Sequence, residues 1–505
     1  MTAVAIRAAL AALACGFVTA SEASGEMPTL MAGTAVVDVS DRSQKILDPC
    51  HAKVLVLVRG NVRAALVTID AVAIGGIGRI GDDFLPVVRR GIESCCGIPA
   101  SGLIVNASHC HGIVREDVAE VVIDAVRRAN ASVVPVRAYV GSGREDRISE
   151  NRRLRMKDGS EIDLRRAYSS PDNNAVAGIG AIDPTIGLMR LDRVTGGTLA
   201  VVYVFACHPI MNPPWKGSSA DFPGVASSLI ERTIGDGMTA FFVQGCGGDI
   251  NPLGYKDLGP PDATPLGLRL GASVLRALDC LQESTDASLA THAERIDLPR
   301  ADDHRERIEK LEAERRRLVD SLVATPINFR EFLPLVVSQG AFPDAPSLHR
   351  HRVLHEESLG MSDIADHDAS TRQAVADYRR NLDTMEAITR LNVNLALLER
   401  HREVVARAAS DTLSVDVHGL RVGDFRLVTF PGELSAAIGM DIRESVGCAT
   451  AFVAGYTNGY IHYAPTPAQR RNAGYAQEDC DSMVAAGWLE RFEPRAVAIL
   501  ESLGE

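Results

Sequence analysis

The sequence predicts an α/β fold, in which a mixed sheet core is covered by helices and carries a helical insertion. Three observations predict this class. Short apolar runs bounded by Gly, Asp and Asn recur along the chain, as is typical of strands. Amphipathic segments with helical periodicity lie between these runs. Residues 300–410 differ from the rest, because they are rich in Arg, Glu, Leu and Ala.

The clearest strand predictions are runs that are mostly apolar throughout. Such runs are typical of strands that are covered on both faces. The predicted strands are residues 53–58, 64–69, 103–107, 199–206, 239–243, 427–430 and 451–454. Between them, apolar spacing predicts helices over residues 115–129 and 222–234.

The insertion at about residues 300–410 has its own pattern. Apolar residues at helical spacing over residues 302–323 and 371–409 predict two long helices. A loop containing Pro and His, residues 324–368, joins them. Two roles stay open for this insertion: it covers the functional site, or it is an antiparallel hairpin with a structural role alone.

Length and charge limit the classes of function. The chain has 505 residues, and we predict one large domain over residues 30–505 that contains the insertion. The net charge is −12 and there is no block of basic residues. Because phosphate binding needs clustered Lys and Arg, we expect no nucleic-acid partner. The sequence makes no prediction of the oligomeric state.

The N-terminus predicts an export signal over residues 1–23. Arg7 precedes an apolar stretch over residues 8–20, and small residues then surround a plausible cut after Ala20 or Ala23. The stretch is too short to span a membrane, so we expect an exported protein, periplasmic or secreted, with at most peripheral membrane contact. Cys15 leaves a lipoprotein open, although the residues before it match that signal poorly. The alternative is a buried first helix.

Histidines follow two of the predicted strands. His109 and His111 come after the strand over residues 103–107. In an extended chain, side chains two residues apart point the same way, so both imidazoles are expected to face one pocket. His208 follows another apolar strand and precedes Pro209. A single His there is more often a core residue than a ligand.

Acidic and phenolic groups follow two later strands. Glu433 comes after Pro431-Gly432, a turn that aims its carboxylate away from the strand end. Tyr460 and Tyr463 lie on either side of His462, which strand alternation predicts to point away from the site. Three or four such ligands leave a zinc ion an open position for water, which predicts a hydrolase.

Other candidate residues have two interpretations each. Cys110 is either a thiolate ligand or a small buried residue, and we favour the second. The glycine-rich segment over residues 244–252 either holds an oxyanion on its N–H groups or forms a tight turn stabilised by Asp249 and Asn251. The histidines of the insertion indicate a second metal or, as we favour, a solvated helical face. These histidines are His351, His355 and His367.

In order along the chain, these segments resemble the neutral (non-lysosomal, alkaline) ceramidase superfamily over about residues 30–480. The family's His-Thr-His-Ser-Gly-Pro, Asn-Arg and second-histidine motifs resemble His109-Cys110-His111-Gly112, Asn151-Arg152, and His208 with Ser219 to Gly224. Its Gly-Asp loop, Pro-Gly-Glu and Asn-x-Tyr-x-x-Tyr motifs resemble residues 244–252, Pro431 to Glu433 and Asn458 to Tyr463.

The resemblance implies a zinc site and an activity. The implied Zn²⁺ ligands are His109, His208, Glu433 and Tyr460. The implied contacts to the scissile amide and its neighbouring hydroxyls are His111, Arg152 and Tyr463. The implied chemistry is attack of metal-activated water on an amide carbonyl. Manganese and iron remain alternatives to zinc, since this ligand set suits several divalent ions.

The sequence also departs from the family pattern. Gly112-Ile113-Val114 replaces Ser-Gly-Pro, and Gly245 stands where true ceramidases have a serine. We expect no C-terminal immunoglobulin-like domain. Because the implied ligands are kept while the substrate-facing parts differ, we expect the substrate to be an N-acyl amide or related small, lipid-like molecule other than ceramide. The alternatives are a metal-dependent esterase, lactonase or deacetylase, and a non-catalytic binding protein on the same fold.

Overall fold

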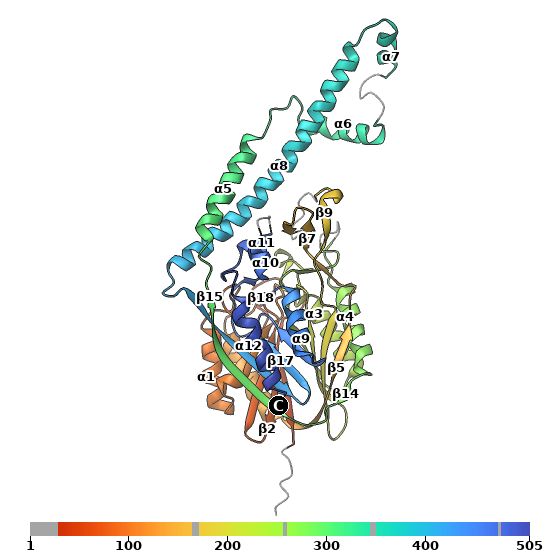
Figure 1. Ribbon diagram of the computed structural model, residues 1–505. Helices are drawn as coiled ribbons and strands as arrows, with labels where there is room; N and C mark the ends of the chain where they lie inside the picture. The colour runs from red at the N-terminus through yellow and green to blue at the C-terminus, as the bar shows by residue number, and fades with distance from the viewer. Residues whose placement is uncertain (1–28, 164–170, 256–259, 344–349, 473–475, 505) are drawn as a thin grey trace, which may run out of the picture.

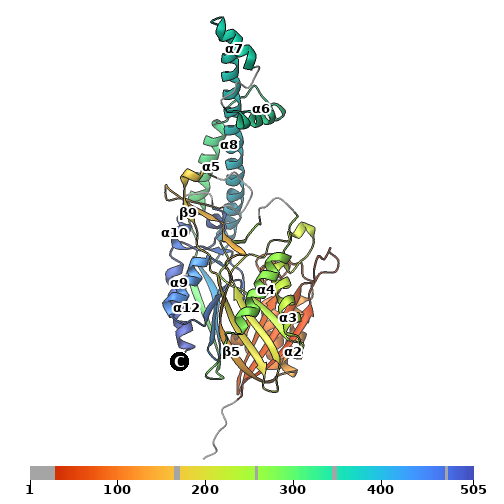
Figure 2. The same ribbon diagram turned by 90° about the vertical axis from the view of Figure 1, so that its right-hand side faces the viewer.

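The computed structural model describes residues 29–163, 171–255, 260–343, 350–472 and 476–504. Its body contains β-sheets whose inner faces share one apolar core, with helices on the outside, and a helical arm projects from one end (Figure 1, Figure 2). This arrangement confirms the predicted α/β class with a mixed sheet core and a helical insertion. The predicted export signal, residues 1–23, lies outside the described residues.

The larger sheet has nine strands in the order β12-β11-β10-β5-β1-β2-β3-β4, with β14 (Gln282–Glu283) paired to β5. Its strands are β1 (Met31–Asp38), β2 (His51–Arg59), β3 (Val62–Ile69), β4 (Leu103–Ala107), β5 (Val134–Arg144), β10 (Thr185–Arg193), β11 (Thr198–Phe205) and β12 (Thr239–Gln244). Only two residue pairs join β1 to β5, so the sheet consists of two halves, β1 to β4 and β5 with β10 to β12. Residues 52–57 of β2 are buried throughout, which explains their continuous apolar run.

A four-stranded sheet completes the core in the order β15-β16-β17-β19. Its strands are β15 (Leu289–Pro299), β16 (Thr412–Val422), β17 (Phe425–Thr429) and β19 (Ala451–Ala454). One apolar cluster contains residues from this sheet and from both halves of the larger sheet, such as Leu57, Val202 and Leu427. Three strand groups therefore surround a common core.

Each strand group carries helices on its outer face. Helices α1 (Phe84–Cys96) and α2 (Val118–Ala131) cover β1 to β4, and α3 (Asp221–Ile234) and α4 (Thr264–Leu278) cover the β10 to β12 half. Helices α9 (Ala436–Val446) and α12 (Leu489–Ser502) cover the four-stranded sheet. In each group one helix connects a parallel pair: β3-α1-β4, β11-α3-β12 and β17-α9-β19. The carboxyl ends of these pairs carry the candidate site.

The arm consists of α5 (His304–Asp320), α6 (Phe329–Ala341), α7 (Arg350–Ser358) and α8 (Asp363–Ala406). The two predicted helices are present as α5 and α8, but the predicted loop over residues 324–368 was wrong in part, because it contains α6 and α7. A capping box between Asn328 and Glu331 begins α6, and the helix continues through Pro334. The loop prediction was based on the Pro and His residues of this segment, several of which lie within the two helices.

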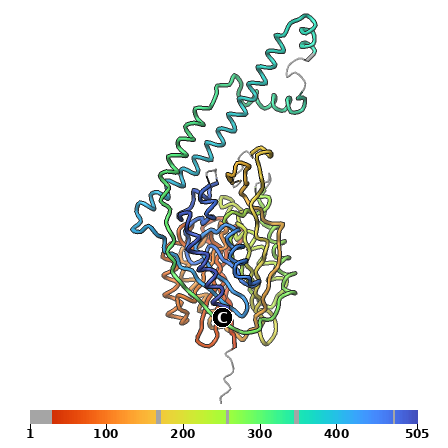
Figure 3. The backbone as a smooth tube through the Cα atoms, viewed as in Figure 1, coloured from red at the N-terminus to blue at the C-terminus, as the bar shows by residue number. Residues whose placement is uncertain are grey.

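The arm extends away from the body, and its foot packs on it through α11 (Gln477–Cys480) (Figure 3). Helices α5 and α8 lie side by side in both ribbon views (Figure 1, Figure 2). Most of the arm therefore does not cover the carboxyl ends of the strands. Within the described residues, no helix is both long and apolar enough to cross a membrane.

Candidate metal centre

Three buried side chains from three strand groups meet at one point. His109 follows β4, His208 follows β11, and Glu433 begins the short strand β18 (Glu433–Leu434) after β17. Their ligand atoms all lie within 4.8 Å of one another. None of the three side chains is more than 5% exposed. These three residues, hereafter the first cluster, are three of the four predicted metal ligands, and the fourth, Tyr460, contacts Glu433.

Backbone carbonyls orient both imidazoles of the first cluster. The Nδ1 atom of His109 lies 2.6 Å from the carbonyl oxygen of Val72, and that of His208 lies 2.9 Å from the carbonyl oxygen of Ile250. A carbonyl only accepts, so each Nδ1 carries the hydrogen and donates it. The Nε2 atoms then face Glu433, at 3.6 Å for His109 and 3.0 Å for His208.

This arrangement fits a divalent metal ion. Burial and the nearby charge of Arg152 lower the pKa of His208 to about 3, so this ring is neutral. Burial opposes the ionisation of Glu433, but His109 and His208 hold the pKa of its carboxyl well below the usual range. The imidazoles lower this pKa only when Nε2 carries a proton; a neutral ring that donates from Nδ1 presents a lone pair at Nε2 instead, which repels a carboxylate. A cation between them removes that repulsion, and the Nδ1 bonds are those that metal-bound histidines typically make.

Two tyrosines bind the carboxylate of Glu433. The hydroxyl of Tyr460 donates to Oε1, and that of Tyr456 lies 3.2 Å from Oε2. Burial and the charge of Glu433 raise the pKa of both phenols well above the ordinary value. Tyr456 is completely buried and was missed by the sequence reasoning. Its only signal was its position two residues before the Asn458-Gly459-Tyr460 motif.

The segment that carries these tyrosines, residues 455–463, is held by amide side chains; we call it the tyrosine loop. Asn458 has a φ of 56°, and its side chain accepts from the Val105 N–H and donates to the Leu103 carbonyl, both at 2.8 Å. It therefore replaces a strand partner for β4. Asn106 of β4 donates to the Gly455 carbonyl at 2.8 Å and accepts from the Gln244 N–H. These bonds explain why asparagine occurs at both positions.

Arg152 and Tyr463 lie together beside the first cluster. The Arg152 side chain is buried, and its guanidinium lies 3.3 Å from the Tyr463 hydroxyl. Tyr463 begins β20 (Tyr463–Ala464), which pairs with β18 so that Tyr463 is next to Glu433. Arg152 also forms a 2.6 Å ion pair with Glu478, which carried no sequence motif. Glu478 thus balances the buried charge of Arg152.

His111 lies on the more exposed side of the site. Its ring is 6.5 Å from that of His109, the two planes are at 87°, and the residue is half-buried. The expectation that the two imidazoles face one pocket assumed an extended chain. His109 instead has a φ of 66°, which turns the backbone between them. His111 therefore does not join the first cluster.

The glycine-rich segment is a buried turn, as the second interpretation expects. The N–H of Gly247 donates to Gly245, that of Gly248 to Leu434 and that of Ile250 to Gly247, so these donors are occupied. A Cβ on Gly248 would lie 2.6 Å from the Glu433 carbonyl oxygen, which explains the glycine. Asp249 accepts from Asn151 at 3.1 Å and from the Ala436 N–H at 2.8 Å, which stabilises the turn.

Cys110 is buried and is not part of the first cluster. Burial and the neighbouring Cys50 raise the pKa of its thiol well above the ordinary value, so it is protonated. Cys50, Cys95 and Cys96 are free thiols.

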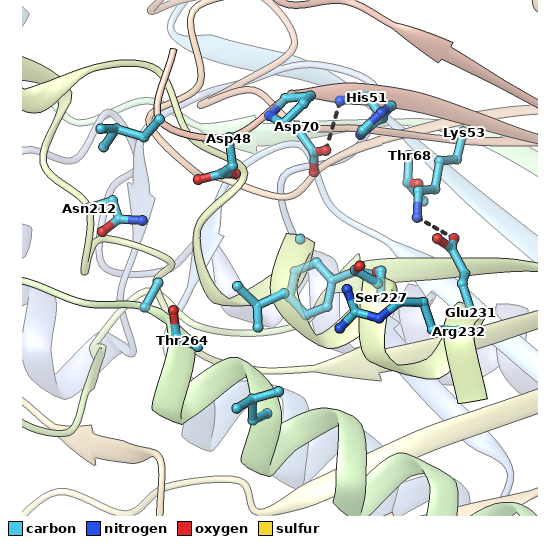
Figure 4. A pocket seen from close by; sticks show the side chains of 18 of the residues that line it. Asp48, His51, Lys53, Thr68, Asp70, Asn212, Ser227, Glu231, Arg232 and Thr264 are labelled. Carbon is cyan, nitrogen blue, oxygen red and sulfur yellow. Dashed lines mark hydrogen bonds and ion pairs between the residues drawn. The ribbon is translucent and has the colours of Figure 1, made fainter. Parts of the chain in front are cut away.

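A separate cavity of about 700 Å³ lies between the larger sheet and helices α3 and α4 (Figure 4). Asp48, His51, Asp70 and the ion pair of Lys53 with Glu231, at 2.7 Å, are among the side chains that line it. None of the predicted site residues is among the described residues that line this cavity. The chemistry of the first cluster therefore does not take place there.

Comparison with protein-family models finds no match, and neither does comparison with curated proteins. Among solved structures, neutral ceramidase from Pseudomonas aeruginosa matches with a TM-score of 0.57 and 16% identity, over 95% of this chain and 75% of that one. A ceramidase complexed with C2 matches with a TM-score of 0.60 and 17% identity, over 95% and 76%. The chain therefore has a ceramidase-like fold, as the sequence resemblance implied.

Proposed function

We propose that this protein is an exported, zinc-dependent hydrolase that cleaves the amide bond of an N-acyl amide or related lipid-like molecule. One observation carries the proposal. At the carboxyl ends of three strand groups, two imidazoles fixed through Nδ1 turn their Nε2 atoms towards one buried carboxylate. This donor set suits a catalytic zinc ion, which keeps a position open for water. The ceramidase-like fold supports an amide as the substrate.

His109, His208 and Glu433 hold the ion in this proposal, and Tyr460 is the fourth ligand. When bound, zinc acts as a Lewis acid that polarises a carbonyl and lowers the pKa of a water molecule. Tyr456 donates to Glu433 and so fixes the orientation of its carboxylate. The Tyr460 hydroxyl already touches the same carboxylate, so it lies within reach of an ion bound there.

The remaining predicted residues bind and orient the substrate. Arg152 fixes the Tyr463 hydroxyl next to Glu433, where that hydroxyl donates a hydrogen bond to the carbonyl oxygen as it gains negative charge. The positive charge of Arg152 strengthens this donor. His111, on the more exposed side, transfers a proton to the leaving amine.

Two alternatives compete with amide hydrolysis. The same metal chemistry cleaves esters, so an esterase, lactonase or deacetylase uses the same residues. A non-catalytic binding protein keeps the fold without turnover. The departures Gly112 to Val114 and Gly245 favour a substrate other than ceramide.

Matched substrates test the proposal. The purified mature protein is stripped with a chelator, reloaded with zinc, and given N-acyl amides, esters of the same acyl chains, and a short-chain ceramide. We expect zinc-dependent hydrolysis of the amides, fastest for a substrate simpler than ceramide. Hydrolysis of esters alone would contradict the amide assignment. Ceramide cleavage as fast as that of any simpler amide would contradict the substrate assignment, and no turnover with any substrate would favour the binding protein.

A further inference from the structure

A second group of side chains, outside the first cluster, also has the composition of a metal site. It contains His401 near the end of α8, His462 in the tyrosine loop, and Asp481 directly after α11. Their ligand atoms all lie within 4.8 Å of one another. We call these three residues the second cluster. It joins the arm to the loop that carries Tyr460 and Tyr463.

Both imidazoles of the second cluster converge on one carboxylate oxygen. The Nε2 atom of His401 lies 2.7 Å from Oδ1 of Asp481, and the Nδ1 atom of His462 lies 3.3 Å from the same oxygen. Arg400 also reaches this oxygen, at 3.2 Å. His462 has a φ of 62°, in the left-handed region that histidine adopts infrequently. His462 contacts Asp481, although its ring also lies 5.1 Å from that of Tyr460.

The second cluster is largely enclosed, and one ring nitrogen of His401 is unpartnered in the described part of the chain. The side chains of His401 and Asp481 are 1% and 11% exposed. Nδ1 of His401 has no hydrogen-bond partner among the described residues, although it is buried. The ring of His304 lies 6.1 Å from that of His401, and its Nε2 atom is also buried and unpartnered in the described part of the chain. It is the Nε2 atom of His401 that faces Asp481, so the unpartnered Nδ1 is not the ligand atom, and a metal site here depends on the convergence of this Nε2, the His462 ring and the Asp481 carboxylate.

We propose that His401, His462 and Asp481 bind a second divalent metal ion of the zinc class. Two imidazoles and one carboxylate are typical ligands of zinc, and they are poorly suited to calcium or magnesium, which prefer oxygen. The enclosed position favours a structural ion over a catalytic one. The proposal does not depend on the proposed hydrolase activity, because it uses none of the residues of the first cluster.

The second ion fixes the foot of the arm to the tyrosine loop. The rings of His462 and Tyr460 are 5.1 Å apart, and the backbone N–H of Tyr463 donates to the Asp481 carbonyl at 3.1 Å. A ligand from α8 and a ligand from the loop held by the same ion restrain both segments. The arm thereby positions the two tyrosines next to the first cluster without covering them.

Metal analysis of four proteins tests this proposal. Wild-type protein, His401→Ala, His208→Ala and the control His367→Ala are loaded with zinc, dialysed against metal-free buffer and analysed for zinc per chain. His367 is an exposed histidine on the same helix as His401. If structural zinc binds tightly, as is usual, we expect about two ions in the wild type and the control and about one in each of the other two. His401→Ala retaining the wild-type zinc content would overturn the proposal.

A second pair of variants addresses folding and separates the two clusters. Asp481→Asn keeps the size of the side chain and removes its charge, and it is combined with His208→Ala. With cobalt in place of zinc, we expect the visible absorption of bound cobalt in His208→Ala and its loss in the double variant, with circular dichroism unchanged between them. No cobalt absorption in a folded His208→Ala protein means that the second cluster is an ion-pair contact only, and the proposal fails. Zinc in the second cluster without any at the first would instead contradict the proposed function alone.

Discussion

The two histidine–carboxylate clusters have the same composition, but their side chains are held differently. In the first cluster each ligand follows a strand, and both imidazoles donate from Nδ1 to backbone carbonyls. In the second cluster the ligands come from a helix end, a loop and the residue after a short helix, and Nδ1 of His401 has no partner within the described residues. The first cluster is pre-organised by the strands, as catalysis requires. The second depends on the arm being docked.

The tyrosine loop belongs to both clusters. Tyr456 and Tyr460 contact Glu433 on one side, and His462 contacts Asp481 on the other. Tyr456 and His462 both have positive φ values, which persist only where the surrounding contacts fix the backbone. Substitutions on either side of this loop therefore distinguish a catalytic ion from a structural one.

The largest effect is expected for Glu433→Gln. Glutamine has the same size but no charge, so the first cluster loses its only carboxylate. We expect hydrolysis to fall to background and the metal of the first cluster to be lost, while that of the second cluster stays. Rates with the best amide and zinc content per chain measure both effects. Glu444→Gln, an exposed change on α9, is the matched control, and turnover by Glu433→Gln near that of this control would break the comparison.

The next effect concerns the buried charge beside the first cluster. Arg152→Met leaves the buried carboxylate of Glu478 without its 2.6 Å partner. Breaking a buried pair typically costs about 3–5 kcal/mol. Because Arg153 stays 3.3 Å from the other carboxylate oxygen of Glu478, we expect a loss in the free energy of unfolding at the lower end of that range. Urea denaturation measures it. Arg155→Met, at an exposed position of β7 (Arg153–Met156), is the control, and equal losses for the two variants would contradict the account.

A smaller effect on zinc affinity distinguishes the two tyrosines that contact Glu433. Tyr456→Phe removes a group that orients the carboxylate, and such changes typically weaken metal binding by about 10–100-fold. Tyr460→Phe removes the proposed fourth ligand, so we expect a greater loss of affinity. Competition with a zinc chelator gives both affinities. If Tyr460→Phe binds zinc as tightly as the wild type, Tyr460 is not a ligand.

The smallest effect lies at the foot of the arm and depends on pH. Burial opposes the ionisation of Asp303, but Arg470 and Arg307 lower the pKa of its carboxyl to about 2, from the ordinary value of 3.8. A carboxyl with a lowered folded-state pKa stabilises the protein above its unfolded-state pKa, and this contribution is lost as the pH falls through the folded-state value. We therefore expect Asp303→Asn to be less stable than the wild type at pH 5 and the difference to shrink towards pH 2. Urea denaturation midpoints at several pH values measure this difference in stability. A difference that grows as the pH falls would contradict the prediction.

The sequence predicted best the positions of the side chains that follow strand ends. His109, His208 and Glu433 each follow an apolar run that is buried on both faces, so the position of each side chain follows from the position of its strand. The strand over residues 451–454 was predicted at the bounds that the structure has. Parallel pairs place carboxyl ends together, which is why residues distant in sequence meet.

The sequence did not predict the contacts that isolated polar residues make. Tyr456 and Glu478 are buried and contact predicted site residues, but neither belongs to a periodic pattern. His401 lies in a helix whose docking depends on tertiary contacts, so nothing in the sequence relates it to His462. His351, His355 and His367, which we considered as ligands of a second metal, are exposed on the arm. Their exposure fits the solvated helical face that we favoured.

The central claim is that the first cluster binds the catalytic ion. Its most direct test is an anomalous difference map from crystals of the zinc-loaded mature protein, recorded on both sides of the zinc absorption edge. We predict a strong peak between the Nε2 atoms of His109 and His208 and the carboxylate of Glu433, within ligand distance of the Tyr460 hydroxyl. A map in which these side chains keep their positions and no peak lies between them would contradict the account.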